Sequence, residues 1–305
     1  MSTLPPAGGP PAGPPAEQQP PVCPRHPDRP SYVRCQRCGR PACPECQRPA
    51  AVGVHCVDCV AEAARSAPVA RTALGAPLRQ GRPVVTLTII GLCVVSYVLQ
   101  LVLPGWTRLW VFSPSNALDE PWRAVTSAFL HAQGLPLHLA FNMVALWMIG
   151  PYLESTLGRA RFVTLYLLSA VGGAVATFVL AVPSYSPVPY PSAWWGGTVG
   201  ASGAVFGLFG AVLLVLRRLG RDARGILGII VLNGVLGFVL PGVSWQAHLG
   251  GLLVGLALGA AYAWAPVARR RLVAVVAPLA VVVLLVVATS GALLWLGSRS
   301  LLGGP

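Results

Sequence analysis

Seven long apolar stretches, separated by short polar ones, follow one another from residue 84 to the end of the chain. Their approximate limits are 84–103, 137–153, 162–182, 200–216, 225–240, 246–264 and 272–296. A helix needs about 17 to 25 residues to cross a bilayer, and each stretch has or approaches that length. The pattern therefore predicts an all-α protein that crosses the membrane seven times, the fifth helix being the shortest.

The residues before this series have a different pattern. Residues 1–22 are rich in Pro and Gly and lack the apolar core of a signal peptide, so we expect a disordered tail. Seven of the eight cysteines lie within 23–60, which predicts a small metal-binding domain. We expect a linker at 61–83, a core of six transmembrane helices at 84–265, and a seventh transmembrane helix with its tail at 266–305.

Composition supports a membrane protein, because 54% of the residues are hydrophobic, only 10% are charged and the mean hydropathy is +0.65. All 22 basic residues are arginines, and the net charge of +13 could also indicate a nucleic-acid partner. Their positions decide between the two, because most of them lie before the first helix or in alternate loops. These are Arg65, Arg71, Arg79, Arg82, Arg159, Arg161, Arg217, Arg218, Arg221, Arg224, Arg269, Arg270 and Arg271.

Loops rich in arginine are cytoplasmic by the positive-inside rule, which predicts a cytoplasmic N-terminus and an external C-terminus. Topology thus explains the net charge, and we expect no nucleic-acid partner. The predicted location is the bacterial cell membrane, with the lipid bilayer as the surrounding medium.

With this orientation the second, fourth and sixth helices all begin at the outer face, and each carries polar residues near its start. His138 and Asn142 lie four residues apart on one helix face, Ser202 begins the fourth helix, and His248 follows Gln246 on the sixth. At about 1.5 Å of rise per residue, all of these side chains lie within roughly 10 Å of the outer surface.

This set of residues suits acyl transfer. A serine hydroxyl becomes a strong nucleophile when an imidazole takes its proton, and the resulting oxyanion needs hydrogen-bond donors. His138, Asn142 and the backbone N–H of Ser202 are candidate donors. Phe206, one turn after Ser202, is placed to lie against the imidazole of His248. Glycines at four-residue spacing predict close contact between the fourth and sixth helices; they are Gly203, Gly207, Gly251, Gly255 and Gly259.

Four short motifs resemble the signatures of the rhomboid family of intramembrane serine proteases, in the family's order. They are Trp122-Arg123, His138-Leu139-Ala140-Phe141-Asn142, Gly200-Ala201-Ser202-Gly203 and Ala247-His248-Leu249-Gly250-Gly251. The resemblance implies a six-helix core, a Ser202–His248 dyad, an oxyanion site of His138 and Asn142, and a membrane-embedded first loop around Trp122 and Arg123. It also implies endopeptidase activity on single-span or polytopic membrane proteins, with no catalytic cofactor. The stretch from His131 to His138 departs from the pattern by inserted residues.

Alternative interpretations exist for these motifs. Gly-x-Ser-Gly in a membrane helix is often a packing motif, and the chain is alternatively an inactive relative, a transporter or a receptor. A proton-coupled transporter needs carboxylates inside the membrane, but the acids after Arg82 all lie in or near loops. They are Asp119, Glu120, Glu154 and Asp222. The same inventory predicts a dyad without a third, carboxylate member.

The N-terminal segment contains four pairs of metal-ligand residues, each pair separated by two others: Cys23 and His26, Cys35 and Cys38, Cys43 and Cys46, and Cys56 and Cys59. Eight ligands suit two tetrahedral zinc sites, and disulfides are not expected in the cytoplasm. The spacing resembles a B-box zinc finger, which implies that the first pair shares an ion with the third and the second with the fourth. A sequential pairing, or His55 in place of Cys56, stays open. Such closed sites are structural, and a cytoplasmic protein partner is a further expectation.

Overall fold

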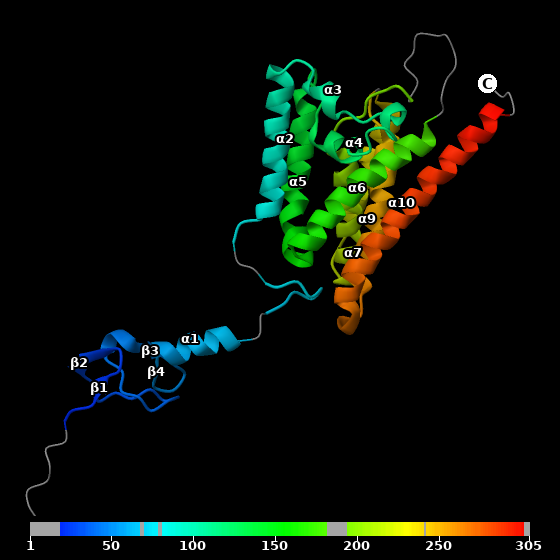
Figure 1. The fold of residues 1–305 in the computed structure, drawn as a ribbon. Coiled ribbons are helices and arrows are strands. Elements are labelled where there is room, and N and C mark those ends of the chain that lie inside the picture. The colour runs from blue at the N-terminus through cyan, green and yellow to red at the C-terminus, as the bar shows by residue number, and fades with distance from the viewer. Residues whose placement is uncertain (1–18, 68–69, 79–80, 182–193, 241, 302–305) are drawn as a thin grey trace, which may run out of the picture. The chain divides into compact units, whose positions relative to one another are not determined.

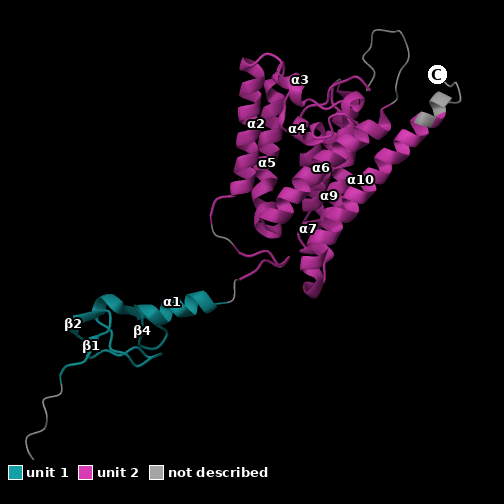
Figure 2. Cartoon of the chain, viewed as in Figure 1, with its two compact units in different colours: residues 1–69 teal, residues 70–305 magenta. Residues whose placement is uncertain are grey.

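The computed structural model describes residues 19–67, 70–78, 81–181, 194–240 and 242–301. They form two compact units, residues 1–69 and residues 70–305 (Figure 2). Most of the tail that we predict to be disordered, residues 1–18, lies outside the described residues.

The first unit contains two small antiparallel sheets and one helix (Figure 1). β1 (Val22–Cys23) pairs with β2 (His26–Pro30), and β3 (Gln47–Pro49) pairs with β4 (Val54–Cys56). A 3₁₀ turn, η1 (Pro44–Cys46), precedes β3, and α1 (Val57–Ser66) follows β4. The buried cluster is made of cysteines and Ala42, so the described part of this unit has no core of large apolar side chains. The helix α1 continues past residue 60, where the sequence suggested that the domain ends.

The second unit contains all seven long helices that the hydrophobic pattern predicts. They are α2 (Val84–Val102), α5 (Pro136–Leu157), α6 (Arg159–Leu180), α7 (Ser202–Arg218), α8 (Arg224–Val239), α9 (Trp245–Trp264) and α10 (Arg270–Leu301). Among the described residues, five helical segments are long and apolar enough to cross a membrane, while α7 and α8 are shorter, at 17 and 16 residues. The protein is therefore an integral membrane protein of the all-α class.

Short elements fill the connection between α2 and α5. They are α3 (Trp106–Trp110), η2 (Pro114–Asn116), α4 (Arg123–Thr126) and η3 (Ser127–Phe129). One further 3₁₀ turn, η4 (Val267–Arg269), leads into α10. In Figure 1 the first loop and the start of α7 lie at one end of the helical unit, and the starts of α2, α6 and α10 lie at the other.

The helix α7 lies at the centre of this unit, with most of its side chains buried. It packs against α9 along the glycine seam that the sequence predicts: a Cβ added to Gly251 would overlap the backbone of Gly203, and one added to Gly255 would overlap Gly207. The same face of α9 meets α6, where a Cβ on Gly173 would lie 2.9 Å from the carbonyl oxygen of Ala247. Because these contacts are backbone to backbone, the three helices lie unusually close together.

Several helix limits differ by a few residues from those expected, and two of the differences affect charged or glycine positions discussed below. The helix α5 continues to Leu157, so Glu154 lies inside it and is buried. Its carboxylate accepts hydrogen bonds from the backbone N–H groups of Val85 and Thr86 and from the Thr86 hydroxyl, and it thereby caps the start of α2. The helix α7 begins at Ser202 rather than at Gly200, because Gly200 has a φ of +127° that a right-handed helix does not allow.

Residues 70–78, which the sequence places in a linker, pack against the helical unit. Leu74 and Ala76 are buried there, and the Thr72 hydroxyl donates to the Thr156 carbonyl oxygen at 2.9 Å. Arg161 and Arg270 donate to the carbonyl oxygens of Leu74 and Ala73. The hydropathy pattern does not predict that this segment packs against the helices, because hydrogen bonds to main-chain carbonyl oxygens hold it in place.

Candidate active site and metal centre

Ser202 and His248 come to the same level of the helical unit through the contact of α7 with α9. A Cβ added to Gly203 would lie 3.2 Å from the carbonyl oxygen of Ala247, and these two residues directly adjoin Ser202 and His248. Within the described residues, no hydrogen bond joins the Ser202 hydroxyl to the His248 imidazole. Catalytic hydrogen bonds are often long in proteins without substrate and shorten when it binds.

The His248 ring is oriented by packing. Phe206 stacks on it with ring centroids 4.1 Å apart and an angle of 11° between the planes, so the contact suggested by the spacing along α7 is present. On the α8 side, a Cβ added to Gly237 would lie 3.5 Å from His248 Nδ1. This nitrogen is buried and has no hydrogen-bond partner among the described residues. The Phe206 ring therefore covers one face of the imidazole, and a glycine lies beside Nδ1, where soluble serine proteases have a carboxylate.

His138 faces the start of α7. The backbone N–H of Ala132 donates to His138 Nδ1 at 3.3 Å, so the neutral ring carries its proton on Nε2. A Cβ added to Gly200 would lie 2.8 Å from His138 Nε2 and 3.7 Å from Ser202 Oγ, which places both atoms around the same point. An N–H donor thus lies beside the serine hydroxyl, as stabilisation of an oxyanion requires.

Asn142 is buried one turn further along α5. Its side-chain Nδ2 donates to the His138 carbonyl oxygen at 2.8 Å. An amide NH₂ group carries two hydrogens, so one remains for a further acceptor. The N–H of Ser202 belongs to the first turn of α7, where no helical carbonyl accepts it.

The first loop holds the segment that leads into α7. Thr198 N donates to Phe112 O at 2.7 Å, and Gly200 N donates to Ser127 O at 3.1 Å. The loop itself is organised by Arg123, a buried side chain that donates to two main-chain carbonyl oxygens and pairs with Glu120 at 2.7 Å. Trp122, in contrast, is half exposed. Arg123 thus acts on the loop, and Glu120 is occupied by it.

The residue pattern did not single out Gln100, which fixes the inserted stretch before α5. Its side chain accepts from His131 N and donates to His131 O, both at 2.9 Å. His131 is fully buried, with its ring centroid 5.3 Å from that of His138. A glutamine in an otherwise apolar span is the signal that could have identified this contact.

The first unit gathers the eight predicted metal ligands in two groups of four among its described residues. Cys23, His26, Cys43 and Cys46 form one group, Cys35, Cys38, Cys56 and Cys59 form the other, and within each group the ligand atoms lie within 4.8 Å of one another. The grouping is interleaved, and it contains Cys56 rather than His55, which pairs with Arg48 in the β3–β4 sheet.

The distances suit zinc. A tetrahedral ion with Zn–S of about 2.3 Å and Zn–N of about 2.0 Å separates two sulfurs by about 3.8 Å and a sulfur from a nitrogen by about 3.5 Å. The Sγ atoms of Cys43, Cys46 and Cys23 lie 3.3, 3.4 and 4.0 Å from His26 Nδ1, and Cys38 Sγ lies 3.8 Å from Cys56 Sγ. The other ring nitrogen of His26 lies 4.0 Å from a Glu45 carboxylate oxygen, the kind of outer partner that orients a metal-binding histidine.

The thiols in these groups differ in acidity. A hydrogen bond from the backbone N–H of Cys43 is the main cause that lowers the pKa of Cys23 to about 6. Burial beside other sulfurs raises the pKa of Cys46 to about 11 and that of Cys59 to about 12. A divalent cation would hold both as thiolates at neutral pH, because the thiolate is the form that binds metal.

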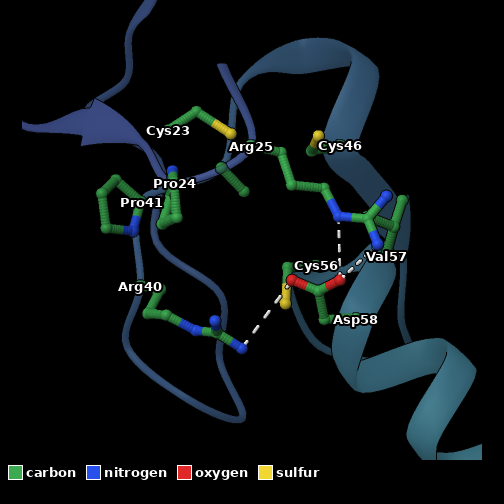
Figure 3. Close-up of a pocket in the computed structure, with 10 residues that line it drawn as sticks. Cys23, Pro24, Arg25, Arg40, Pro41, Cys46, Cys56, Val57 and Asp58 are labelled. Atoms are coloured by element: carbon green, nitrogen blue, oxygen red, sulfur yellow. Dashed lines mark hydrogen bonds and ion pairs between the residues drawn. The ribbon is translucent and has the colours of Figure 1, made fainter. Parts of the chain in front are cut away.

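One aspartate connects the two groups (Figure 3). Asp58, between Cys56 and Cys59, accepts a hydrogen bond from Arg25 Nε at 2.9 Å and lies 3.8 Å from Arg40. Arg25 lies between Cys23 and His26 of the first group, and Arg40 donates to Cys38 Sγ of the second. The pairs are largely exposed, so they contribute little energy, but they link the two halves of the unit.

The helical unit thus defines a class: an integral membrane protein in which a serine, two histidines and an asparagine meet between closely packed helices. Residues 118–265 match the family model described as the Rhomboid domain. YdcA of Bacillus subtilis is 36% identical over 147 residues, which cover 47% of this chain and 67% of that protein. The chain therefore belongs to the rhomboid family.

Two further relatives carry the name rhomboid protease. GluP of Bacillus subtilis is 35% identical over 201 residues, 61% of this chain and 36% of its own length. AarA of Providencia stuartii is 27% identical over 216 residues, 61% of this chain and 75% of its own. The chain spans about a third of the length of GluP.

Proposed function

We propose that the protein is an intramembrane serine endopeptidase in which Ser202 is the nucleophile and His248 the general base. The observation that carries the proposal is the meeting of Ser202, the Phe206-stacked His248 and His138 around the start of α7. The names of the relatives GluP and AarA support the activity.

In the proposed reaction, the Ser202 hydroxyl attacks the carbonyl carbon of the scissile peptide while its proton passes to His248. The nitrogen that accepts it is Nε2, because Nδ1 faces Gly237. The oxyanion of the tetrahedral intermediate accepts hydrogen bonds from His138 Nε2, from Asn142 and from the N–H of Ser202. His248 then returns the proton to the leaving amine, and water hydrolyses the acyl-enzyme with the same histidine as base.

The proposal needs no carboxylate. Glu154 accepts a hydrogen bond from the backbone N–H of Thr86 at the start of α2, and Glu120 forms an ion pair with Arg123. Asp222 accepts a hydrogen bond from the backbone N–H of Arg224. We therefore expect that Asp119→Asn, Glu120→Gln and Asp222→Asn keep the cleavage activity when the protein folds. A loss of several orders of magnitude in one of them at normal expression would reveal a third catalytic member.

The substrates we propose are single-span or polytopic membrane proteins, cut in the outer part of a transmembrane segment. Arg217 and Arg218 mark the cytoplasmic end of α7 by the positive-inside rule, so Ser202 lies toward the outer face. A helical substrate hides its carbonyls in its hydrogen-bond ladder, so helix-weakening residues such as glycine should favour cleavage. Mapping of the cut by mass spectrometry tests this, and a cut near the cytoplasmic end would contradict it.

The decisive experiment compares cleavage of a labelled single-span reporter by the wild type, Ser202→Ala and His248→Ala in the same membranes. Each substitution should lower cleavage by at least about 10³-fold, since the members of such a pair act together. Ser290→Ala on α10 is the matched control and should cleave as the wild type does. Equal cleavage by Ser202→Ala and the wild type would leave an inactive relative that only binds membrane proteins.

For the first unit, the proposal is two structural zinc ions, one in each group of four ligands, with no part in the chemistry. All four positions of each ion are filled by side chains, and a catalytic zinc keeps one position open. Metal analysis of the purified protein should give two zinc ions per chain, and Cys43→Ser together with Cys46→Ser should remove one of them. A cytoplasmic protein partner of this unit stays a prediction from the sequence.

A further inference from the structure

A cavity of about 610 Å³ opens at the end of the helical unit opposite to Ser202. Among the described residues, its wall is formed by members of 71–77 and 81–84, by the end of α5, by the start of α6 and by one residue of α10. In Figure 1 the starts of α2, α6 and α10 and the end of α5 lie at this same end. The volume is in the range of sites that hold small ligands.

The cavity is strongly basic. The ionisable lining residues that the structure describes are Arg71, Arg82, Arg159, Arg161 and Glu154, four positive charges against one negative, which leaves +3. The single carboxylate is already satisfied by Val85, Thr86 and Arg159. The chain itself therefore supplies no further anion from the described lining residues.

Arg71 and Arg82, the two described arginines that precede α2 in this wall, have few internal partners. Arg71 donates to one carbonyl oxygen, that of Gly75, and no hydrogen bond or ion pair of the Arg82 side chain is present among the described residues. Both are exposed. Arg161, by contrast, donates to Leu74 O and Arg270 O, so its position is fixed by the fold. Guanidinium groups with unused donors, beside others whose position is fixed, suit the binding of an anion from outside.

We infer that this cavity binds the phosphate of an anionic lipid headgroup. Guanidinium groups bind phosphate oxygens in pairs, and basic pockets between membrane helices at the cytoplasmic side are sites for such headgroups. The cavity lies where the spans end, and the apolar residues Val84, Leu157 and Ala274 form part of its wall, which suits the first carbons of an acyl chain. The bound phosphate would join Arg71 and Arg82, on the segment that leads to the zinc unit, to Arg159 at the start of α6.

The test measures retention of phosphatidylglycerol by the full-length protein, purified in detergent, by native mass spectrometry, with phosphatidylcholine as the neutral comparison. The double variant Arg71→Gln/Arg82→Gln should bind phosphatidylglycerol roughly thirtyfold more weakly, since each arginine near a membrane surface contributes about a fivefold effect. Arg221→Gln/Arg224→Gln removes the same charge from the same face outside the cavity and should change retention by less than about threefold.

A second arm replaces the lipid by inorganic phosphate at constant ionic strength and follows the thermal unfolding midpoint. Phosphatidylglycerol should raise the midpoint of the wild type and not that of the Arg71→Gln/Arg82→Gln variant, while phosphate alone should raise neither. A rise with phosphate alone that the double variant loses would assign the cavity to a soluble phosphate compound and overturn the lipid assignment. Equal retention by the wild type and Arg71→Gln/Arg82→Gln, or an equal loss in Arg221→Gln/Arg224→Gln, would overturn the site.

Discussion

Two features of the structure at position 200 exclude every amino acid except glycine. Its φ of +127° disfavours any side chain, and a Cβ there would lie 2.8 Å from the His138 ring. We expect Gly200→Ala to lower reporter cleavage by at least about tenfold while the protein still folds, because displacement of His138 by a fraction of an ångström weakens the oxyanion site.

The measurement is the cleavage rate per folded molecule, with Gly105→Ala as the matched control. Gly105 also has a positive φ, of +85°, but a Cβ there would meet nothing within 4 Å. This variant carries the backbone strain without the clash and should keep the wild-type rate. Equal losses in the two variants would show that strain alone, and not contact with His138, explains the effect.

We propose Phe206 as a positioning residue for the proposed base, His248. Replacement by leucine removes the stack on His248, and we expect a kcat that is lower by about two- to tenfold, the range that an aromatic pair contributes, with KM little changed. Phe209→Leu is the control, because Phe209 meets the edge of Phe206 rather than the imidazole. A change confined to KM would contradict the positioning role.

Among contacts of single residues, the sequence best predicts those that depend on spacing along a helix. The contact of Phe206 with His248 follows from the positions of Ser202 and Phe206 one turn apart, once two helices are assumed to face each other. The hydrogen bond from Ala132 to His138 and the contacts of Gln100 could not be predicted, because they depend on how an irregular insertion folds back. Our proposed roles for these residues still await the variants described above.

Among the elements, α7 and α9 depend most on the absence of side chains between them. Gly255→Ala places a methyl group into the backbone of Gly207, and overpacking of this kind costs about 1–3 kcal/mol. We expect a clear fall in the thermal unfolding midpoint in detergent and a parallel loss of cleavage.

The control for this prediction is Gly291→Ala on α10, where a Cβ meets nothing within 4 Å. Alanine favours helix over glycine by up to about 1 kcal/mol, so this variant should be as stable as the wild type or slightly more so. A stable, active Gly255→Ala protein would mean that the helices can separate without loss of the site.

The elements themselves could largely be predicted from hydropathy, because each span must be long and apolar. The ends could not, and Glu154 shows why. Its charge suggests a loop, but inside the helix its carboxylate is satisfied by the start of α2, a contact 68 residues away in sequence from Thr86. Polar residues near a span end therefore say little about where the helix stops.

For the molecule as a whole, the division into two compact units predicts that each unit folds and unfolds independently of the other. Deletion of residues 1–69 removes the metal groups and should leave reporter cleavage in detergent within about twofold of the wild type, because every proposed catalytic contact lies in the second unit. A chelator should unfold the first unit and leave the second intact, since a module of this size without an apolar core needs its metal to fold.

A longer deletion, of residues 1–83, is the informative comparison. It also removes the buried Leu74 and Ala76 and the hydrogen bond from Thr72 to Thr156, so its unfolding midpoint should fall below that of the shorter deletion. Complete loss of cleavage in a well-folded 1–69 deletion would make the zinc unit part of the catalytic machinery. Cysteine content and hydropathy predict two separate units. They assign residues 70–78 to a linker, whereas in the structure these residues belong to the second unit.

The central position of α7 also bears on the order in which the protein is made. Its 17 residues are mostly buried, with α6 on one side and α9, which the ribosome produces later, on another. Until Gly251 and Gly255 have left the ribosome, Gly203 and Gly207 lack their contacts on α9, and Ser202 lacks its proposed base. We expect a nascent chain that ends before α9 to hold its serine in an incomplete site, so that the proposed proteolysis begins only when synthesis of the sixth span is finished.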